Sequence, residues 1–295
     1  MLNKKRDDHI RLEDWHTHNR FCRHAEGTIE DYIKKAIKFN LDLIGISDHF
    51  PYEYLRNSNL RIEQVPFQEY AMRLNEVDSY LSSIEELKLK YKDKIQIRTA
   101  FEIDYFRSHE VDLEKEFYSR VEKLDYILGS VHILHGRSKL FAFDDKRFLK
   151  MYKEYDSIDN IYLEYYQKIQ NMIHSDKFDF DVLSHFDLPK KYNKRAINKD
   201  LVMNEAIKTL DLAKKADLTI EINTGGLRKE INEQYPSYEI IEKMHELDIP
   251  ILFGSDAHHP NDLGYKFDKM LKIVKKIGYS NLAHFNKRKR KFIEI

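Results

Sequence analysis

Short apolar runs alternate with amphipathic stretches along almost the whole chain. The clearest amphipathic stretch follows Thr28, where apolar residues recur at helical spacing and Asp31 is placed to complete a capping box. Residues 43–47 then form a continuous apolar run, which is typical of a buried strand. Repeated βα units of this kind favour a parallel sheet covered by helices.

Each of seven predicted strands ends in polar residues. In chain order, these residues are His16 and His18, Asp48 and His49, Glu102, His132, His185, Asn223, and Asp256 with His258. In a parallel β/α barrel all the carboxyl ends of the strands lie on one face, which is the face that carries the active site. The regularity therefore predicts an α/β barrel with one polar site.

The remaining segments are expected to lie around this barrel. Residues 64–91 should form a charged helical excursion, residues 136–158 an irregular substrate-side loop, and residues 287–295 a last strand. Neither a Pro/Gly/Ser-rich linker nor a sequence repeat interrupts the chain. Residues 1–295 are therefore expected to form a single domain.

Charge and cysteine content narrow the class of protein. The chain has 50 basic residues (Lys and Arg) and 50 acidic residues (Asp and Glu), so its formal net charge is zero. No overall electrostatic field would therefore attract nucleic acid or an anionic membrane. The basic run at 287–291 is short, and it is expected to be a solvated strand or turn. The lone cysteine, Cys22, excludes an internal disulfide, and no run of about 18 apolar residues occurs. These features predict a cytoplasmic protein, whereas the oligomeric state stays open.

The spacing of the first histidines indicates a metal site. In a strand, side chains two residues apart share a face, so His16 and His18 can bind one ion, and His24 follows six residues later. One histidine at a strand end is more often structural, but burying this many ionisable groups without a cation would be costly. Imidazole and carboxylate suit zinc, iron and manganese alike, so the metal identity stays open.

Seven short motifs follow one another in order. They are DWHTH at 14–18, SDH at 47–49, FEID at 101–104, GSVH at 129–132, SHFDLPKKY at 184–192, EINTGGLRK at 221–229 and GSDAH at 254–258. Together they resemble the polymerase and histidinol phosphatase (PHP) superfamily, and most closely its monofunctional histidinol-phosphatase branch.

The resemblance implies a distorted (β/α)7 TIM-like barrel with a trinuclear divalent metal centre of zinc, iron or manganese. By position, the implied ligands are His16, His18, Glu102 and Asp256 for the first metal, His24, His49 and His258 for the second, and His132, His185 and bridging Glu102 for the third. All nine positions carry the expected residue types.

The expected activity is that of a phosphomonoesterase in histidine biosynthesis. It would convert L-histidinol phosphate to L-histidinol and inorganic phosphate, by in-line attack of a metal-bridging hydroxide without a phosphoenzyme. One alternative is a PHP phosphoesterase that acts on nucleotides or nucleic acid ends, which a basic groove would favour. Another is a metal-dependent binding module without activity, which degenerate ligands would mark.

Further residues are predicted to act on the substrate. Arg228 is expected to clamp the phosphate, because a guanidinium matches two phosphoryl oxygens. Lys190, Lys191 and Arg195 are weaker candidates for the same role. Glu102 and Asp256 are expected to be catalytic as metal ligands, and His259 to protonate the leaving alcohol.

Other roles are predicted for several acidic residues and for the single cysteine. Asp144 or Asp145 is expected to meet the substrate amine, and Asp48 and Asp104 to orient metal-bound histidines. Cys22 is expected to be a packed thiol. Surface or packing roles are expected for four further histidines, which are His109, His174, His245 and His284.

Overall fold

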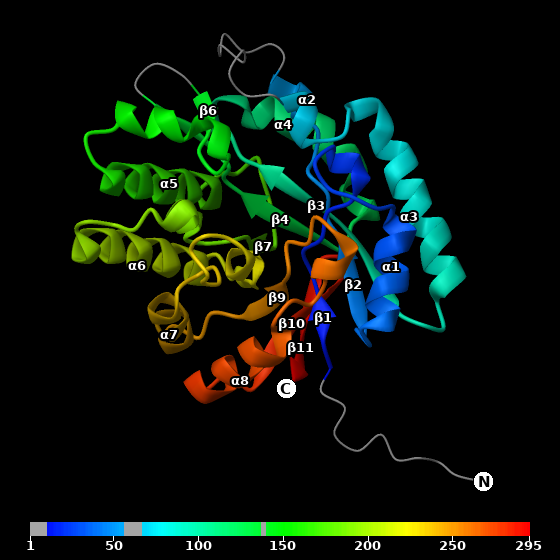
Figure 1. The fold of residues 1–295 in the computed structure, drawn as a ribbon. Coiled ribbons are helices and arrows are strands. Elements are labelled where there is room, and N and C mark those ends of the chain that lie inside the picture. The colour runs from blue at the N-terminus through cyan, green and yellow to red at the C-terminus, as the bar shows by residue number, and fades with distance from the viewer. Residues whose placement is uncertain (1–10, 56–66, 137–139) are drawn as a thin grey trace.

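Seven parallel strands form a nearly closed barrel in the computed structural model, which describes residues 11–55, 67–136 and 140–295 (Figure 1). In their order around the barrel, the strands are β1 (Glu13–Asp14), β2 (Leu43–Ile46), β3 (Gln96–Asp104), β4 (Tyr126–Ser130), β7 (Val182–Leu183), β8 (Thr219–Asn223) and β9 (Ile251–Gly254). The backbone N–H of Trp15 donates to the carbonyl of Phe253 at 3.0 Å and links the first strand to the last. The prediction of a distorted (β/α)7 barrel is confirmed.

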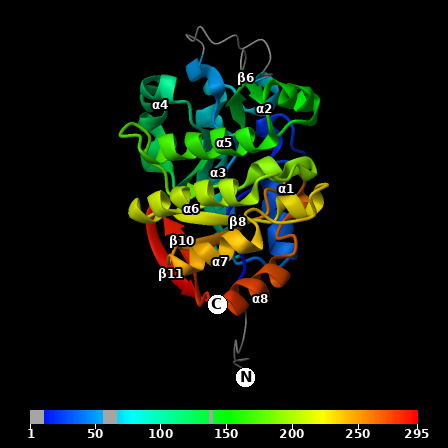
Figure 2. The same cartoon turned by 90° about the vertical axis from the view of Figure 1, so that its left-hand side faces the viewer.

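Helices surround this barrel. They are α1 (Ile29–Lys38), α2 (Phe67–Tyr70), α3 (Val77–Tyr91), α4 (Glu110–Phe117), α5 (Ile158–Ile173), α6 (Lys199–Lys215), α7 (Tyr238–Glu246) and α8 (Phe267–Ile277). Figure 2 shows α5, α6 and α7 stacked side by side on one flank, whereas α1 and α3 cover the opposite flank in Figure 1. No helix within the described ranges is long and apolar enough to cross a membrane.

Local sequence signals explain where helices begin and end. The Thr28 hydroxyl accepts the Asp31 N–H at 3.1 Å, and the Asp31 carboxylate accepts the Thr28 N–H at 2.8 Å, which is the predicted capping box. Asn40 follows α1 with a φ of 57°, a conformation that asparagine tolerates better than most residues. Asn198 caps α6 by accepting the Leu201 N–H.

Two predicted segments differ in detail. The 64–91 excursion is α2, a 3-10 turn at Leu74–Glu76 and α3, with residues 64–66 outside the described residues. The prediction of an irregular 136–158 loop is wrong, because β6 (Leu140–Ala142) pairs antiparallel with β5 (Ile133–His135) and a 3-10 helix, η7, spans Lys146–Glu154. Leu140, Phe141 and Ala142 are all buried, which stabilises this hairpin; residues 137–139 lie outside the described residues.

The carboxyl-terminal segment forms a hairpin outside the barrel sheet. Strand β11 (Lys289–Glu294) pairs antiparallel with β10 (Asn281–Asn286), a strand that the sequence analysis did not predict. At its turn, Arg288 donates from its backbone to Asp125 and pairs with Asp181, both of which precede barrel strands. The hairpin therefore covers the amino end of the barrel, opposite the predicted site.

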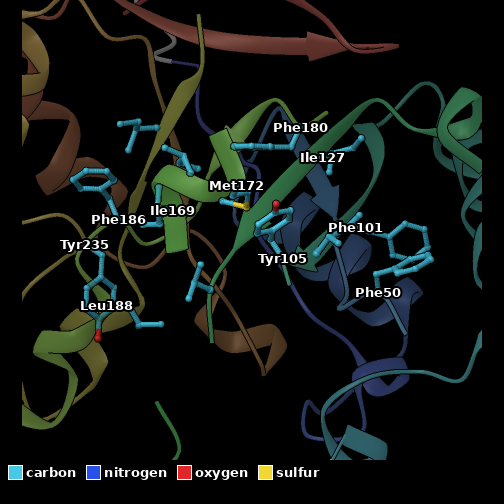
Figure 3. Close-up of a cluster of buried hydrophobic side chains, with 14 of the residues drawn as sticks. Phe50, Phe101, Tyr105, Ile127, Ile169, Met172, Phe180, Phe186, Leu188 and Tyr235 are labelled. Carbon is cyan, nitrogen blue, oxygen red and sulfur yellow. The ribbon is translucent and has the colours of Figure 1, made fainter. Parts of the chain in front are cut away.

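Apolar packing separates into two clusters. The larger cluster fills the space between the strands and the helices, where Phe50 meets Phe101 edge to face at 5.3 Å between ring centroids (Figure 3). The smaller cluster includes Trp15, Tyr126 and Phe285 and packs at the amino end of the barrel. Burial of each large side chain contributes about 1.5–3 kcal/mol, so both clusters hold the strand ends in place.

Candidate metal centre

The structure brings together all nine residues that were predicted as metal ligands. Glu102 lies within β3, near its carboxyl end. The other eight follow the carboxyl ends of strands or lie in the connections after them: His16, His18, His24, His49, His132, His185, Asp256 and His258. The strand β1 is only two residues long, so His16 and His18 extend from its end rather than lying on it. Their Nε2 atoms are nevertheless 3.0 Å apart.

Glu102 lies at the middle of the cluster. Its Oε1 is 2.9 Å from His185 Nε2, and its Oε2 is 3.3 Å from the Nε2 atoms of both His16 and His18. His49 Nδ1 is 3.1 Å from Oε2 on another side. One buried carboxylate therefore faces imidazoles from several strands, as a bridging ligand would.

Asp256 completes the cluster from the turn after β9. Its Oδ1 is 3.3 Å from His18 Nε2. The φ angles of Asp256 (52°) and His185 (22°) are both positive, which is costly for residues with a Cβ. The absence of a Cβ at Gly254 is required, because a Cβ there would lie 1.8 Å from Glu221 Oε1 and 2.6 Å from the His16 Cβ.

The donor set fits divalent cations. Among the described groups of side chains that place their donor atoms within 4.8 Å of one another, three consist only of predicted ligands: His16, His18 and Glu102; His24, His49 and His258; and Glu102, His132 and His185. The Nε2 atoms of His132 and His185 face each other at 3.0 Å, and those of His24 and His258 at 2.9 Å. His49 Nδ1 is buried without a hydrogen bond, although it lies beside Glu102. Lone pairs that converge in this way are the arrangement that a shared cation satisfies.

The pKa values of the clustered side chains reflect the same crowding. Burial alone would raise the pKa of Glu102, but His16, His132 and His49 hold it well below its usual range. Burial lowers the pKa of His49 well below its usual range, because Glu102 offsets it only in part. Glu102 thus remains a carboxylate and His49 a neutral imidazole, which are the forms that bind metals.

Other buried acids fix the orientation of these histidines. His16 Nδ1 is 2.8 Å from Glu221 Oε1, and His132 Nδ1 is 2.9 Å from Asp104 Oδ2. Contacts of this kind leave the opposite nitrogen free for a cation. The sequence analysis anticipated Asp104 but missed Glu221, although its alternation with Asn223 along β8 could have indicated it. Asp48 instead accepts hydrogen bonds from Asn19.

Comparison with known proteins now adds to this geometry. Residues 14–225 match the PHP domain family. The chain is 30% identical over 267 residues to a probable histidinol-phosphatase from Deinococcus radiodurans, covering 90% of this chain and 94% of that protein. The chain belongs to the PHP family.

Two solved structures share the fold of this PHP domain. A putative histidinol phosphatase from Listeria monocytogenes superposes with a TM-score of 0.79 at 26% identity, over 87% of this chain and 99% of that one. Histidinol phosphate phosphatase from Lactococcus lactis was solved with zinc, L-histidinol and phosphate. It superposes with a TM-score of 0.75 at 18% identity, over 95% of this chain and 99% of that one. At that identity the second likeness describes the fold alone.

A cavity of about 370 Å³ opens above the histidine cluster of the PHP domain. Its lining includes Glu102, His132, His185 and Asp256 from the cluster, and Asp144 and Lys191 from the surrounding loops. This volume suits a small molecule. Any substrate in it would lie against the predicted metal ligands.

Of the predicted phosphate contacts, Lys191 lines this cavity, whereas Arg228, Lys190 and Arg195 lie outside its lining. Arg228 donates to the carbonyls of Ser255 and Asp256 at 2.8 and 3.0 Å, so it braces the Asp256 turn from outside the cavity lining. Lys190 is buried against Asp187 at 2.8 Å, and Arg195 pairs with Glu233 at 3.1 Å; both line a separate cavity between helices.

His259 also lies outside the cavity lining. Its Nδ1 accepts the Asn261 N–H at 3.0 Å, and its side chain is 43% exposed. These contacts cap a short 3-10 helix, Pro260–Asp262. The role of His259 as the proton donor stays a prediction. Cys22 is fully buried, and burial raises its pKa less than His18 and His24 lower it, to about 6.

Proposed function

We propose that this protein is a metal-dependent phosphomonoesterase that hydrolyses L-histidinol phosphate to L-histidinol and inorganic phosphate. The observation that carries the proposal is the convergence of seven imidazoles and two carboxylates beneath a small-molecule cavity in a PHP fold. The histidinol-phosphatase relative that covers 90% of the chain supports the choice of substrate.

The proposed ligands divide as the sequence resemblance implied. His16, His18, Glu102 and Asp256 would hold one cation, His24, His49 and His258 a second, and His132 and His185 with Glu102 a third. Divalent cations, when bound, would lower the pKa of a bound water to about 7 and would neutralise the charge on phosphoryl oxygens. The zinc in the Lactococcus lactis structure is that protein's own, so the metal identity here stays open.

Several residues of the chain hold the proposed ligands in fixed orientations. Glu221 and Asp104 fix the ring orientations of His16 and His132, and Arg228 fixes the backbone that carries Asp256. These supports are made before substrate arrives, so no reorganisation is required during the reaction. The floor of the cavity is buried, since His16, His18 and Glu102 are at most 1% exposed.

We also propose that the chain forms a single catalytic domain. The match to the PHP family and the barrel from β1 to β9 support one domain.

A cytoplasmic location is proposed as well. The free thiol of Cys22 is compatible with it. That nucleic acid is no partner remains a prediction from the neutral composition.

The test is phosphate release from a panel of esters by protein loaded with manganese or with zinc. The panel contains L-histidinol phosphate, a sugar phosphate, a nucleoside monophosphate and a phosphodiester. We expect the highest kcat/KM for L-histidinol phosphate, and none above background after chelation. A preference for the diester or the nucleotide would overturn the proposal.

A further inference from the structure

One of the proposed ligands, His18, lacks a contact that other histidines of the cluster make. Four of them place the ring nitrogen Nδ1 within 2.8–3.0 Å of an oxygen atom, namely His16, His24, His132 and His258. His18 Nδ1 is buried and has no hydrogen-bond partner among the described residues. A histidine that binds a cation through one nitrogen usually donates its other N–H to an acceptor. His18 therefore needs an acceptor on its Nδ1 side.

The other ring nitrogen of His18 faces the centre of the cluster. Its Nε2 lies 3.0 Å from His16 Nε2, and 3.3 Å from both Glu102 Oε2 and Asp256 Oδ1. Because the two nitrogens of an imidazole point in nearly opposite directions, Nδ1 points away from these partners. The side chain is 1% exposed, so bulk water does not reach this nitrogen. The acceptor must therefore come from the protein behind the cluster.

The sulfur of Cys22 lies beside His18. Cys22 Sγ and one ring nitrogen each of His18 and His258 lie within 4.8 Å of one another, and Cys22 is fully buried. Burial would lower the pKa of His18, but contacts with Asp256 and then Cys22 raise it well above its usual range. Sulfur is a weak acceptor of hydrogen bonds. The thiol is therefore placed to accept the N–H of the imidazole that lacks an oxygen partner.

The local backbone holds Cys22 in this place. Cys22 is the last residue of a 3-10 helix, η1 (Arg20–Cys22). Asn19 caps this helix with its side chain and donates from its backbone to the Asp48 carboxylate at 2.9 Å. The backbone carbonyl of Cys22 lies 2.8 Å from His24 Nδ1, which donates to it. Cys22 thus contacts two histidines, one through its sulfur and one through its carbonyl.

We propose that Cys22 is a positioning residue for two of the three cations. Its sulfur accepts the Nδ1–H of His18 and its carbonyl accepts the Nδ1–H of His24, which leaves each Nε2 to bind a cation. His18 belongs to the first proposed cation and His24 to the second, so one residue orients a ligand of each. The sequence analysis expected the thiol only to pack. This inference rests on the proposed function, because the ligands are those of the proposed metal centre.

Three substitutions separate the acceptor role from packing. Cys22→Ser keeps an acceptor, Cys22→Val fills the space without one, and Cys22→Ala removes both. In calorimetric titrations with manganese, we expect the affinity to fall about 10- to 100-fold in Cys22→Val and Cys22→Ala. It should stay within about threefold of the wild-type value in Cys22→Ser, because a hydroxyl oxygen also accepts. A thiol that only packs would give the reverse order, since valine is the closer apolar substitute.

Val77→Ala is the matched control for lost packing. Val77 lies on α3 and is fully buried in the larger apolar cluster. Its truncation should lower the thermal midpoint and leave the affinity for manganese unchanged.

Nuclear magnetic resonance of the zinc-loaded protein gives a second readout, which the wild-type protein provides alone. Long-range 1H–15N spectra of protein labelled at histidine show which ring nitrogen carries the proton, and His18→Gln assigns the signal. We expect the proton of His18 on Nδ1. Its resonance should shift in Cys22→Val, whereas that of His132, which contacts Asp104, should stay in place.

Equal affinities of Cys22→Ser and Cys22→Val for manganese would overturn the inference, as would a wild-type His18 without a proton on Nδ1. Failure of the proposed function looks different. In that case the wild-type protein itself would release no phosphate from L-histidinol phosphate, whatever the order of the affinities at position 22.

Discussion

Histidines at the two ends of the barrel have opposite surroundings. At the amino end, His284 Nδ1 lies 3.1 Å from Glu13, and its ring packs edge to face on Trp15 at 5.3 Å. At the carboxyl end, imidazoles face each other and share Glu102. His284 thus has a carboxylate at Nδ1, the Arg98 guanidinium 3.4 Å from Nε2 and a packing role, whereas the Nε2 atoms of the second group face one another.

The comparison teaches how to separate structural from functional histidines. Burial alone does not distinguish them, because both kinds are buried: His284 is 8% exposed and His16 is 0% exposed. The surroundings of the second ring nitrogen do. His284 Nε2 lies beside Arg98. His16 and His132 also have a carboxylate at Nδ1, but their Nε2 atoms face other imidazoles, and a cation would satisfy these lone pairs.

The largest expected effect comes from Glu102→Gln, which removes the shared anion. We expect kcat with L-histidinol phosphate to fall by well over about 100-fold, more than is typical for a residue that only supports a ligand, and the metal content to drop. Elemental analysis and phosphate release measure both. The matched control at the other end, Glu13→Gln, should lower the thermal midpoint and leave the metal content unchanged.

At the amino end, Phe285→Ala should cost stability and not chemistry. Phe285 is 2% exposed and packs against Trp15 with ring centroids 6.1 Å apart. Its truncation should lower the free energy of unfolding by about 3–5 kcal/mol, as for other buried aromatic residues. Denaturant titration measures this, and a changed kcat per folded molecule would argue that the two ends are coupled.

A smaller effect is expected for Asp104→Asn. Asp104 contacts both the backbone N–H and Nδ1 of His132, at 2.7 and 2.9 Å. Loss of the carboxylate should weaken the affinity for manganese by about 10- to 100-fold, because the ring is less firmly oriented and less basic. Calorimetric titration of the metal-free protein tests this, and an unaltered affinity would exclude a positioning role for Asp104.

Taken per pH unit, the smallest expected effect is a gradual pH dependence of metal affinity. Burial would lower the pKa of His132, but Asp104 and Glu102 raise it to about 10 in the metal-free protein. A cation must displace this proton, so its affinity should rise about tenfold per pH unit up to about pH 10. In the metal-free protein, the same proton stabilises the fold fully below pH 6.5, and this stabilisation is lost as the pH rises through about 10.

Calorimetry in buffers of different ionisation enthalpy counts the protons released. His132→Gln should release fewer protons than the wild-type protein. Equal proton release in both would show that another group carries the proton.

Much of the fold was predictable because periodicity and caps act locally. The Thr28 capping box and the apolar strand at 43–47 agree with α1 and β2. The predicted last strand at 287–295 agrees with β11. The β5–β6 hairpin and β10 were not predicted, since short strands in a polar context resemble loops until a partner buries one face.

The sequence by itself determined which residue types reach the carboxyl face, because strand ends in a parallel barrel share one direction. Only the tertiary structure decided how neighbouring side chains divide their roles. Both Asp144 and Asp145 line the cavity, but Asp144 pairs with Lys191 whereas Asp145 caps a 3-10 helix. Arg228 braces a backbone turn. The physical reason is that side-chain direction in a turn depends on distant packing partners, which local spacing does not encode.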